Sequence, residues 1–308
     1  MAFAQVNTGV IAAIVREFGL SGDFLSVGRL YPNTDVTGAY LRRLCATHGF
    51  DPTAVAGIAD DERAPDEAAF FTMLGFSGSA SLDVSIVERP DHLFDMNEAT
   101  LPADLHSRFD LVYNNGTLEH LFHLPNALSN FTRLCRVGGC VLHSVPTNNH
   151  LDHGFYQPSP GLFFDHAAAN RLEIVLSRMY RRPDKRPDTP LEPFGPDFYD
   201  PRREGERTLD GNIYSYFVML RRLPDSLDDQ IPFQGRYDPE TKTGSGGGGR
   251  VEALHSQIAS QRAEIDKLVS LLRQSEENAS LLVENYEKRL KRLQDNNTEL
   301  LRKTLGMS

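Results

Sequence analysis

The stretch FDLVYNNGTLEH, residues 109–120, places a hydrophobic run directly before a cluster of small and polar residues. Phe109, Leu111 and Val112 are typical of a short buried strand, and the following NNG favours a turn. In open α/β sheets, ligands bind in the crevice beyond the carboxyl ends of the strands. The stretch therefore predicts a buried strand with binding groups at its end. The alternative is an ordinary polar loop.

Strand-like and helix-like segments alternate on both sides of this stretch. We expect strands at residues 24–28, 81–87, 92–97, 109–113, 140–146, 172–180 and 212–223, and helices at residues 6–17, 61–76 and 124–134. This order predicts an α/β fold with a doubly wound, mostly parallel sheet. An insertion at residues 182–210 has too many prolines and charges to form a core of its own.

Composition narrows the class of protein. The 308 residues are 40% hydrophobic and 24% charged, as in soluble globular proteins. No apolar run approaches the roughly 20 residues of a membrane helix, and the N-terminus lacks the features of a secretory signal. Cys45, Cys135 and Cys140 show no CxxC spacing and cannot all pair, so we expect reduced, mostly buried thiols and a cytoplasmic location.

The net charge of −10 disfavours nucleic acid as a partner. The acidic excess belongs to the first 249 residues, which carry 22 basic and 33 acidic side chains. The last 59 residues carry ten basic and nine acidic side chains.

The C-terminal part of the chain has a different pattern. Residues 1–235 form the predicted α/β domain, residues 236–250 a Gly/Ser-rich flexible linker, and residues 251–305 an α-helical coiled coil. Apolar or small residues recur every seven positions at Val251, Ile258, Ile265, Leu272, Ala279, Tyr286, Leu293 and Leu300. This seam predicts self-association, with a dimer slightly favoured and the oligomer order open. The alternative is a single amphipathic helix lying on the globular domain.

The run from residue 109 to residue 163 resembles the second half of a class I S-adenosylmethionine-dependent methyltransferase. Three pieces carry the resemblance: the EH after the fourth strand, the helix that ends in RL before a GG turn, and the fifth strand that ends in proline. The run is also similar to a bacterial subgroup with a GTLEH loop and an HGFY stretch before SP. The resemblance covers roughly residues 22–223 and implies a Rossmann-like methyltransferase fold with S-adenosyl-L-methionine as cofactor.

The resemblance also implies a cofactor site. A nucleoside needs an anion to accept from its ribose hydroxyls and a polar partner for its adenine edge. Asp83 matches the ribose acid, with Glu88 as a competing candidate, because strand boundaries are uncertain by about two to four residues. Asp95 and Met96 match the adenine contact of the family. The backbone at Asn115 and Gly116 matches the contact with the amino-acid end of the cofactor.

The turn after the first strand departs from the family pattern. The family has several glycines there, after an acidic residue, whereas LSVGRLYPNTD has Gly28 alone, with Ser26 where the acid often stands. Arg29 and Leu30 make the approach of backbone to a ligand bulkier. A catalytically inactive relative is therefore an alternative to an active enzyme.

Histidines supply the candidate catalytic groups. Methyl transfer to a hydroxyl is an in-line displacement in which the acceptor must also lose a proton. His120 and His153, together with the less favoured His150, follow predicted strands that end at one crevice, and Tyr156 offers a positioning hydroxyl. A metal site made of His150, Asp152 and His153 is not expected, because one extended loop cannot direct all three side chains inward.

The predicted function is S-adenosylmethionine-dependent methyl transfer to a small-molecule or sugar hydroxyl, by an enzyme that is oligomerised through its coiled coil. The alternatives are an inactive methyltransferase-like scaffold and, less favoured because G-x-G-x-x-G is absent, a dinucleotide-dependent oxidoreductase. The methyl acceptor is not evident from the sequence, and we expect the insertion at residues 182–210 to shape its pocket.

The heptad seam leads to a test by truncation. Association removes the seam from water at about 25 cal/mol per Å² of apolar surface, so the full chain should be a homo-oligomer at micromolar concentration. A chain ending at Glu240 should be a soluble monomer that still binds S-adenosylmethionine. Light scattering on both proteins measures this. A monomeric full-length chain would contradict the coiled coil, and an oligomeric truncated chain would place the interface in the α/β domain.

Overall fold

The computed structural model describes residues 2–64, 66–182, 191–204, 209–234 and Lys291. The chain divides into two units, Met1–Asp238 and Pro239–Ser308. The predicted linker and the predicted coiled coil, apart from Lys291, lie outside the described residues.

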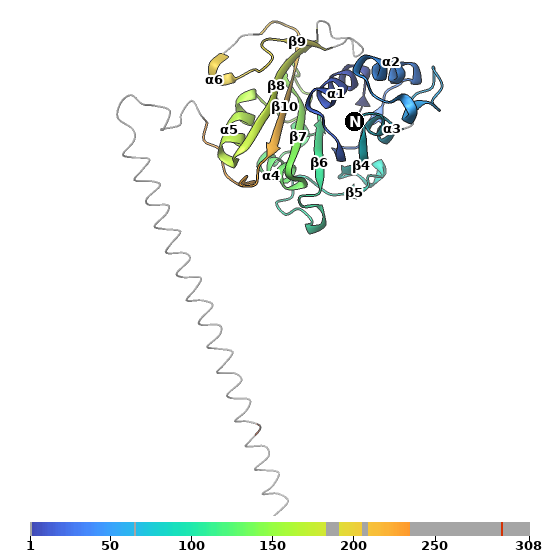
Figure 1. Cartoon of the computed structure of the whole chain (residues 1–308). Helices are drawn as coiled ribbons and strands as arrows, with labels where there is room; N and C mark the ends of the chain where they lie inside the picture. The colour runs from blue at the N-terminus through green and yellow to red at the C-terminus, as the bar shows by residue number, and fades with distance from the viewer. Residues whose placement is uncertain (1, 65, 183–190, 205–208, 235–290, 292–308) are drawn as a thin grey trace, which may run out of the picture. The chain divides into compact units, whose positions relative to one another are not determined.

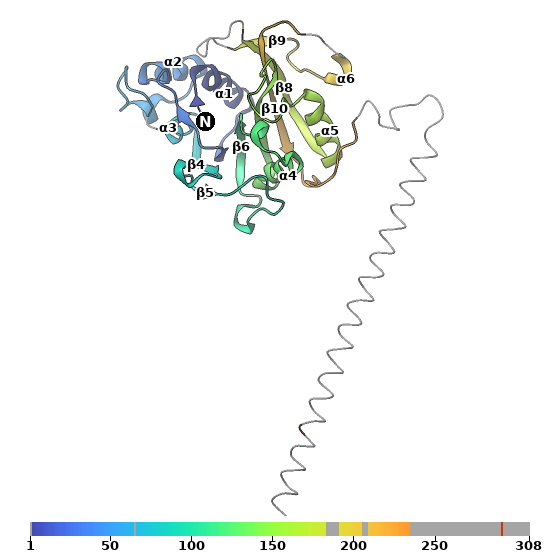
Figure 2. The same ribbon diagram turned by 180° about the vertical axis from the view of Figure 1, so that it is seen from behind.

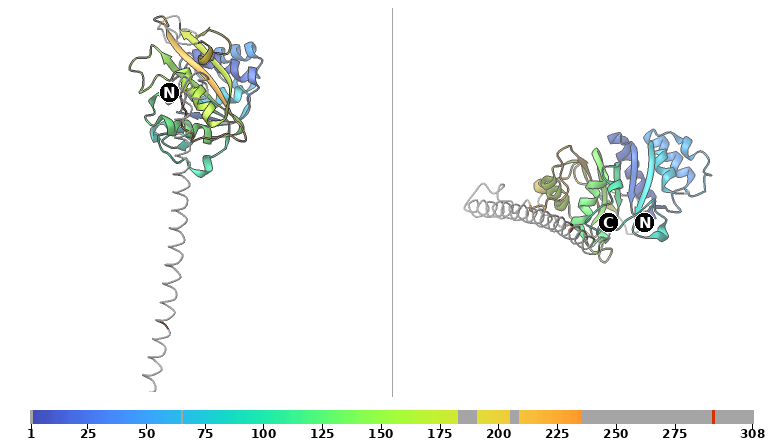
Figure 3. Two further views of the ribbon diagram at one scale, coloured as in Figure 1. Left: turned by 90° about the vertical axis from the view of Figure 1, so that its left-hand side faces the viewer. Right: turned by 90° about the horizontal axis from the view of Figure 1, so that it is seen from below.

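The main sheet of the described part has eight strands in the order β5-β4-β2-β6-β7-β10-β8-β9 (Figure 1). The first five in this order pair in parallel: β5 (His92–Leu93), β4 (Phe76–Asp83), β2 (Gly22–Val27), β6 (Phe109–Asn115) and β7 (Cys135–Asn148). The remaining pairs are antiparallel and involve β10 (Ile213–Arg222), β8 (Leu172–Arg182) and β9 (Glu192–Phe194). The prediction of a mostly parallel α/β sheet is confirmed. Figure 3 shows β8 and β10 in the foreground of its left panel.

Both faces of the sheet are buried, as is typical of parallel sheets. On β6, Leu111 packs in one hydrophobic cluster and Val112 in the other. The first cluster contains residues of α1 (Gln5–Phe18), α2 (Gly38–His48) and α3 (Glu67–Met73) (Figure 1). The second contains residues of α4 (Leu124–Leu134) and α5 (Pro160–Asn170) (Figure 2). The sheet is therefore covered by helices on both faces.

Helix ends follow local sequence signals. Helix α1 ends at Gly19, whose φ of 59° allows its N–H to donate to the Val15 carbonyl. Helix α2 begins at Thr37, whose side chain accepts from Tyr40 N. The sequence predicted α1 and α4 well, but it did not predict α2.

Three predicted elements differ from the structure. The strand predicted at residues 81–87 is β4, which ends at Asp83, where the carboxylate accepts from Ser85 N at 2.9 Å and turns the chain. Ile86–Glu88 is instead a short 3-10 helix, η2. The strand predicted at residues 92–97 is reduced to β5, and the helix predicted at residues 61–76 is reduced to α3, which is capped by Asp66.

The described parts of the insertion join the existing core. Strand β9 extends the sheet edge by pairing with β8, and a short helix, α6 (Pro201–Glu204), follows. Tyr199 belongs to the second hydrophobic cluster, Phe194 and Leu209 pack against that cluster, and Leu191 packs against the first. The insertion is thus stabilised by packing against the sheet and its core, in agreement with a composition that cannot form a core alone.

Two short strands close the N-terminal side of the fold. Strand β1 (Ala2–Phe3) pairs in parallel with β3 (Tyr31–Pro32), which follows the loop after β2. Among the described helices, none has the length and apolar character needed to cross a membrane.

Candidate functional site

The candidate site lies where β2, β4 and β6 end at one edge of the sheet. From β2, the strand order continues to β4 and β5 on one side and to β6 and β7 on the other. This reversal is a topological switch point, at which the loops diverge and a ligand crevice forms. Gly28, Asp83 and Gly116 directly follow or end these three strands. The structure therefore brings together the sequence-predicted cofactor residues from separate parts of the chain.

Two carboxylates hold the loop after β2. Arg29 N donates to Asp83 Oδ2 at 3.0 Å, and Leu30 N donates to Glu67 Oε2 at 3.1 Å. Ser26 Oγ donates to the same Glu67 oxygen at 2.8 Å. Helix α3 thus supplies a carboxylate at Ser26, where the sequence lacks one. Sequence reasoning did not select Glu67, although a glutamate directly before the apolar AAFF was a visible signal.

Glu67 is a buried acid whose carboxylate accepts hydrogen bonds from Ser26 and Leu30. Its residue is 4% exposed, and burial raises its pKa to about 7, against the opposing effect of the hydrogen bonds from Ser26 and Leu30. Gly28, with φ of 82°, allows the sharp turn between these contacts. The loop is therefore held in place by side chains rather than by a run of glycines.

Asp83 is half-buried and already accepts two backbone hydrogen bonds, from Arg29 N and from Ser85 N. A carboxylate offers about four acceptor positions, so capacity for ribose hydroxyls remains. Glu88, the competing acid, lies in η2, and its backbone carbonyl accepts from Tyr31 Oη at 3.1 Å. Between the two acids, the side chains of Val84, Ile86 and Val87 are exposed.

The predicted adenine contacts lie after β5. Asp95 Oδ1 accepts from Asn97 N at 2.9 Å and from Asn97 Nδ2 at 2.8 Å, which forms a turn. The Met96 side chain is 3% exposed and packs in the second hydrophobic cluster. Asp95 therefore presents a polar group at this position, whereas the Met96 side chain belongs to the core.

The turn after β6 is built by its two asparagines. The buried Asn114 accepts through Oδ1 from Thr117 N at 2.9 Å and from Leu118 N at 3.1 Å. Asn115 Oδ1 accepts from Asn7 Nδ2 at 2.8 Å, which ties α1 to the end of β6. Gly116, with φ of 79°, donates from its N–H to the Ser144 carbonyl on β7. The polar residues of NNG thus shape the crevice edge.

Two segments converge beyond β6 and β7 to form a cluster of ionisable side chains. The His120 and His153 rings lie 5.2 Å apart, and His153 Nε2 lies 3.7 Å from Glu119 Oε1. Glu119 is 0% exposed, and burial raises its pKa to about 7. The Tyr156 hydroxyl donates to the Phe122 carbonyl at 2.9 Å. The structure therefore groups the predicted histidines His120 and His153. Glu119, the first residue of the EH pair, is an additional member that was not predicted as a site residue.

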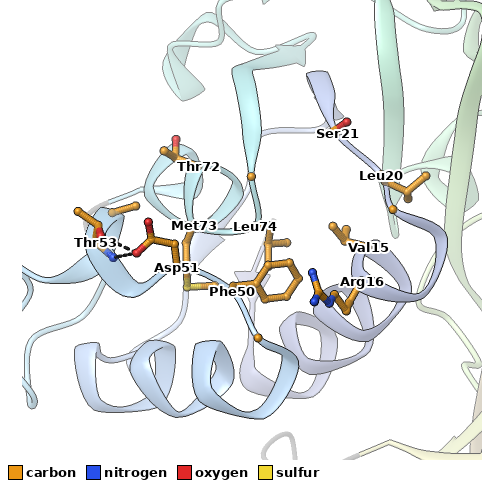
Figure 4. A pocket seen from close by; sticks show the side chains of 14 residues that line it. Val15, Arg16, Leu20, Ser21, Phe50, Asp51, Thr53, Thr72, Met73 and Leu74 are labelled. Carbon is orange, nitrogen blue, oxygen red and sulfur yellow. Dashed lines mark hydrogen bonds between the residues drawn. The ribbon is translucent and has the colours of Figure 1, made fainter.

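A cavity of about 500 Å³ lies beside the end of β7. Its lining comes from the end of β7 and the start of α5, together with Tyr199 and Leu209 of the insertion. A second cavity, of about 670 Å³, lies near the amino ends of β2 and β4 (Figure 4). None of the predicted site residues lines either cavity. The smaller one adjoins the loop that carries His153 and Tyr156, since Asn149 and Ser159 belong to its lining, so it is the better match to a substrate site.

Residues 36–179 match the family model described as a methyltransferase domain. The matched segment includes every predicted site residue except Gly28. Together with the α/β sheet, this match supports a methyltransferase domain in this chain. The match supports the predictions of an S-adenosylmethionine-dependent methyltransferase and of S-adenosyl-L-methionine as its cofactor.

No curated protein matches the chain by sequence. Among solved structures, the N-methyltransferase NodS from Bradyrhizobium japonicum WM9 is 11% identical, with 70% of this chain and 94% of that chain covered and a TM-score of 0.36. The 1,6-didemethyltoxoflavin-N1-methyltransferase from Burkholderia thailandensis, solved with 1,6-didemethyltoxoflavin and S-adenosylhomocysteine, is 16% identical. Its match covers 71% of this chain and 80% of that chain, with a TM-score of 0.34.

The buried Glu67 leads to a pH-dependent stability test. Its folded pKa is about 7 against 4.5 when unperturbed, so the protonated form stabilises the fold below about pH 4.5 and this contribution is lost as the pH rises to about 7. Glu67→Gln keeps an acceptor for Ser26 without a titrating charge. Relative to wild type, it should gain up to about 3 kcal/mol of unfolding free energy between pH 4.5 and pH 8.

Urea unfolding followed by near-UV circular dichroism at both pH values measures this gain. Glu98→Gln, at an exposed position, is the matched control and should follow the wild-type pH dependence. An unchanged difference between wild type and Glu67→Gln across this range would show that Glu67 does not titrate as a buried acid.

Proposed function

We propose that this protein transfers the methyl group of S-adenosylmethionine to a hydroxyl of a small molecule or sugar. The observation that carries the proposal is the cluster of Glu119, His120 and His153, which lies at the edge of the sheet where the predicted cofactor residues also lie. The crevice supplies a place for the cofactor, and the cluster supplies groups that can activate a hydroxyl.

The cofactor would lie across the carboxyl ends of β2, β4 and β6. Asp83 would accept from the ribose hydroxyls, and the exposed Val84 and Ile86 would cover the adenine ring, with Asp95 and the Met96 backbone at its edge. The turn at Asn115 and Gly116 would face the amino-acid end. Gly28 would allow the backbone to approach the ligand closely.

The reaction is an in-line displacement. The acceptor oxygen forms a bond to the methyl carbon as the sulfur–carbon bond breaks, which leaves S-adenosylhomocysteine. The hydroxyl proton must leave as this bond forms. His153 Nε2 faces the Glu119 carboxylate at 3.7 Å, an arrangement that supports His153 as a base or as a group that positions the acceptor. His120 completes the cluster, and Tyr156 holds the loop through Phe122.

The acceptor would occupy the cavity of about 500 Å³ beside the end of β7. Tyr199 and Leu209 line this cavity, which supports a role for the insertion in shaping the acceptor pocket. The loop that carries His153 starts at Asn149 in the lining and returns to it at Ser159. His153, Tyr156 and part of the acceptor pocket thus share one loop.

A second candidate function is that of a methyltransferase-like scaffold that binds cofactor without turnover. The observation that favours it is the single glycine in the loop after β2. The contacts of Glu67 and Asp83 with that loop favour the active enzyme instead. We further infer self-association through residues 251–305 and a cytoplasmic location, both on the sequence pattern alone.

Asp83 can be tested through cofactor affinity. Asp83→Asn keeps an acceptor for one backbone N–H but removes the charge, so S-adenosylmethionine should bind more weakly by about 1.5–3 kcal/mol. Isothermal titration of the folded variant measures this loss. Glu88→Gln is the matched control from the same loop and should bind as wild type does. The reverse pattern would move the ribose contact to Glu88.

His153 can be tested through turnover. His153→Ala should lower the rate of S-adenosylhomocysteine release by about 100-fold or more, the usual size of a general-base contribution, with cofactor affinity nearly unchanged. A coupled assay with a panel of hydroxyl acceptors measures the rate. His123→Ala is the control, because His123 is exposed and lies three residues after His120. This variant should turn over normally.

Normal turnover in His153→Ala would remove this residue from the reaction. A wild-type protein that binds the cofactor but methylates no acceptor of the panel would favour the scaffold.

A further inference from the structure

Glu119, His120 and His153 have the composition and spacing of a metal site. Their ligand atoms all lie within 4.8 Å of one another. Nitrogen and oxygen ligands bind a first-row ion at about 2.0–2.2 Å, so two ligands of one ion lie up to about 4.4 Å apart. The 3.7 Å between His153 Nε2 and Glu119 Oε1 already fits this range. Small rotations of the two exposed imidazoles bring the set within bonding range.

The Glu119 carboxylate lacks the partners that a buried acid needs. The residue is 0% exposed, and neither of its oxygens has a hydrogen-bond partner among the described residues. A buried acceptor without a partner costs about 1–3 kcal/mol, and more when it is charged. A cation at the centre of the cluster would satisfy both oxygens and remove this cost.

A simple ion pair with His153 accounts for less of the geometry. The separation of 3.7 Å is longer than a hydrogen bond, and the His153 side chain is 52% exposed, so solvent screens the pair. An ion pair also leaves the second Glu119 oxygen unsatisfied and gives no role to His120. A shared ion explains all three side chains together.

Backbone contacts hold the two ligand-bearing segments together. Asn114 Oδ1 caps the start of the turn that carries Glu119 and His120. Tyr156 N donates to the Glu119 carbonyl at 3.2 Å. Gly154 lies so close that a Cβ there would be 2.7 Å from the same carbonyl oxygen. The two backbone segments that carry the ligands are therefore held together before any ion binds, and only the imidazole side chains need to rotate.

We propose that Glu119, His120 and His153 bind one divalent first-row transition ion, of which Zn²⁺ is the representative. Two imidazoles and one carboxylate form a set that Zn²⁺, Mn²⁺, Fe²⁺ and Co²⁺ accept, whereas Mg²⁺ prefers oxygen ligands. Three protein ligands leave open positions for an exogenous oxygen. This set differs from the one weighed in the sequence, since His150 and Asp152 are not part of it.

The catalytic consequence rests on the proposed function. An acceptor hydroxyl at an open position of the ion has a lowered pKa and loses its proton to solvent. The resulting oxygen forms the bond to the methyl carbon while the sulfur–carbon bond of the cofactor breaks. His153 then acts as a ligand that positions the acceptor rather than as the base.

The test is metal binding by the untagged full-length protein, freed of metal with a chelator. Co²⁺ titration followed by visible absorption and Zn²⁺ titration calorimetry should each show one equivalent bound. Glu119→Gln and His153→Ala should weaken binding by about tenfold or more. His123→Ala removes an exposed histidine three residues after His120 that is not part of the cluster, and this variant should bind metal as the wild type does. Mg²⁺ should give no heat in the same range.

Absence of stoichiometric binding by the wild type, or wild-type affinity in either cluster variant, would overturn the proposal. His153 is exposed, so its variant should remain folded, which circular dichroism verifies. A separate titration with S-adenosylmethionine in the absence of metal reports on the proposed function alone. Failure of the metal site and failure of cofactor binding are thereby distinguished.

Discussion

Parallel pairing of β2 with β6 is the constraint on which the site depends. In this register Phe24 lies opposite Leu111 and Val27 opposite Asn114, so both strands end at the same edge. The chain reaches β4 and β5 on one side of this pair and β7 on the other. Because the connections leave in opposite directions, the residues that follow each strand gather at the edge where open α/β sheets bind their ligands.

The loop after β2 shows how a carboxylate from elsewhere can replace a glycine-rich turn. A backbone N–H that faces a crevice must be satisfied, and here Asp83 and Glu67 accept from Arg29 N and Leu30 N. The arrangement costs stability, because burial disfavours the charged form of Glu67. In return, the backbone of a loop with one glycine has hydrogen-bond partners at Arg29 and Leu30. In this α/β fold, neighbouring elements thus complete the hydrogen bonding of a turn that has a single glycine.

The cluster beyond β6 and β7 illustrates a different balance. Glu119 is buried without hydrogen-bond partners among the described residues, beside two exposed histidines. Such a carboxylate destabilises the fold unless a proton or a cation is bound. A functional role for Glu119 therefore comes at the expense of the stability of the fold around it. At the rest of the edge, Asn114 and Asp83 accept from backbone N–H groups and stabilise the crevice instead.

Local pattern was enough for the strand at β6, the helix at α4 and the alternation that predicts a mostly parallel sheet, because periodic burial is written in neighbouring residues. It also placed His120 and His153 at strand ends. It could not place the end of β4, since exposed Val84 and Ile86 continue an apolar alternation, which is interrupted where the Asp83 carboxylate accepts from Ser85 N. Nor could it select Glu67 or Glu119, whose roles depend on partners 41 and 34 positions away in the chain. Which carboxylates are buried, and against what, was decided only when the strands came together, because hydrogen-bond partners and desolvation are properties of packing rather than of local sequence.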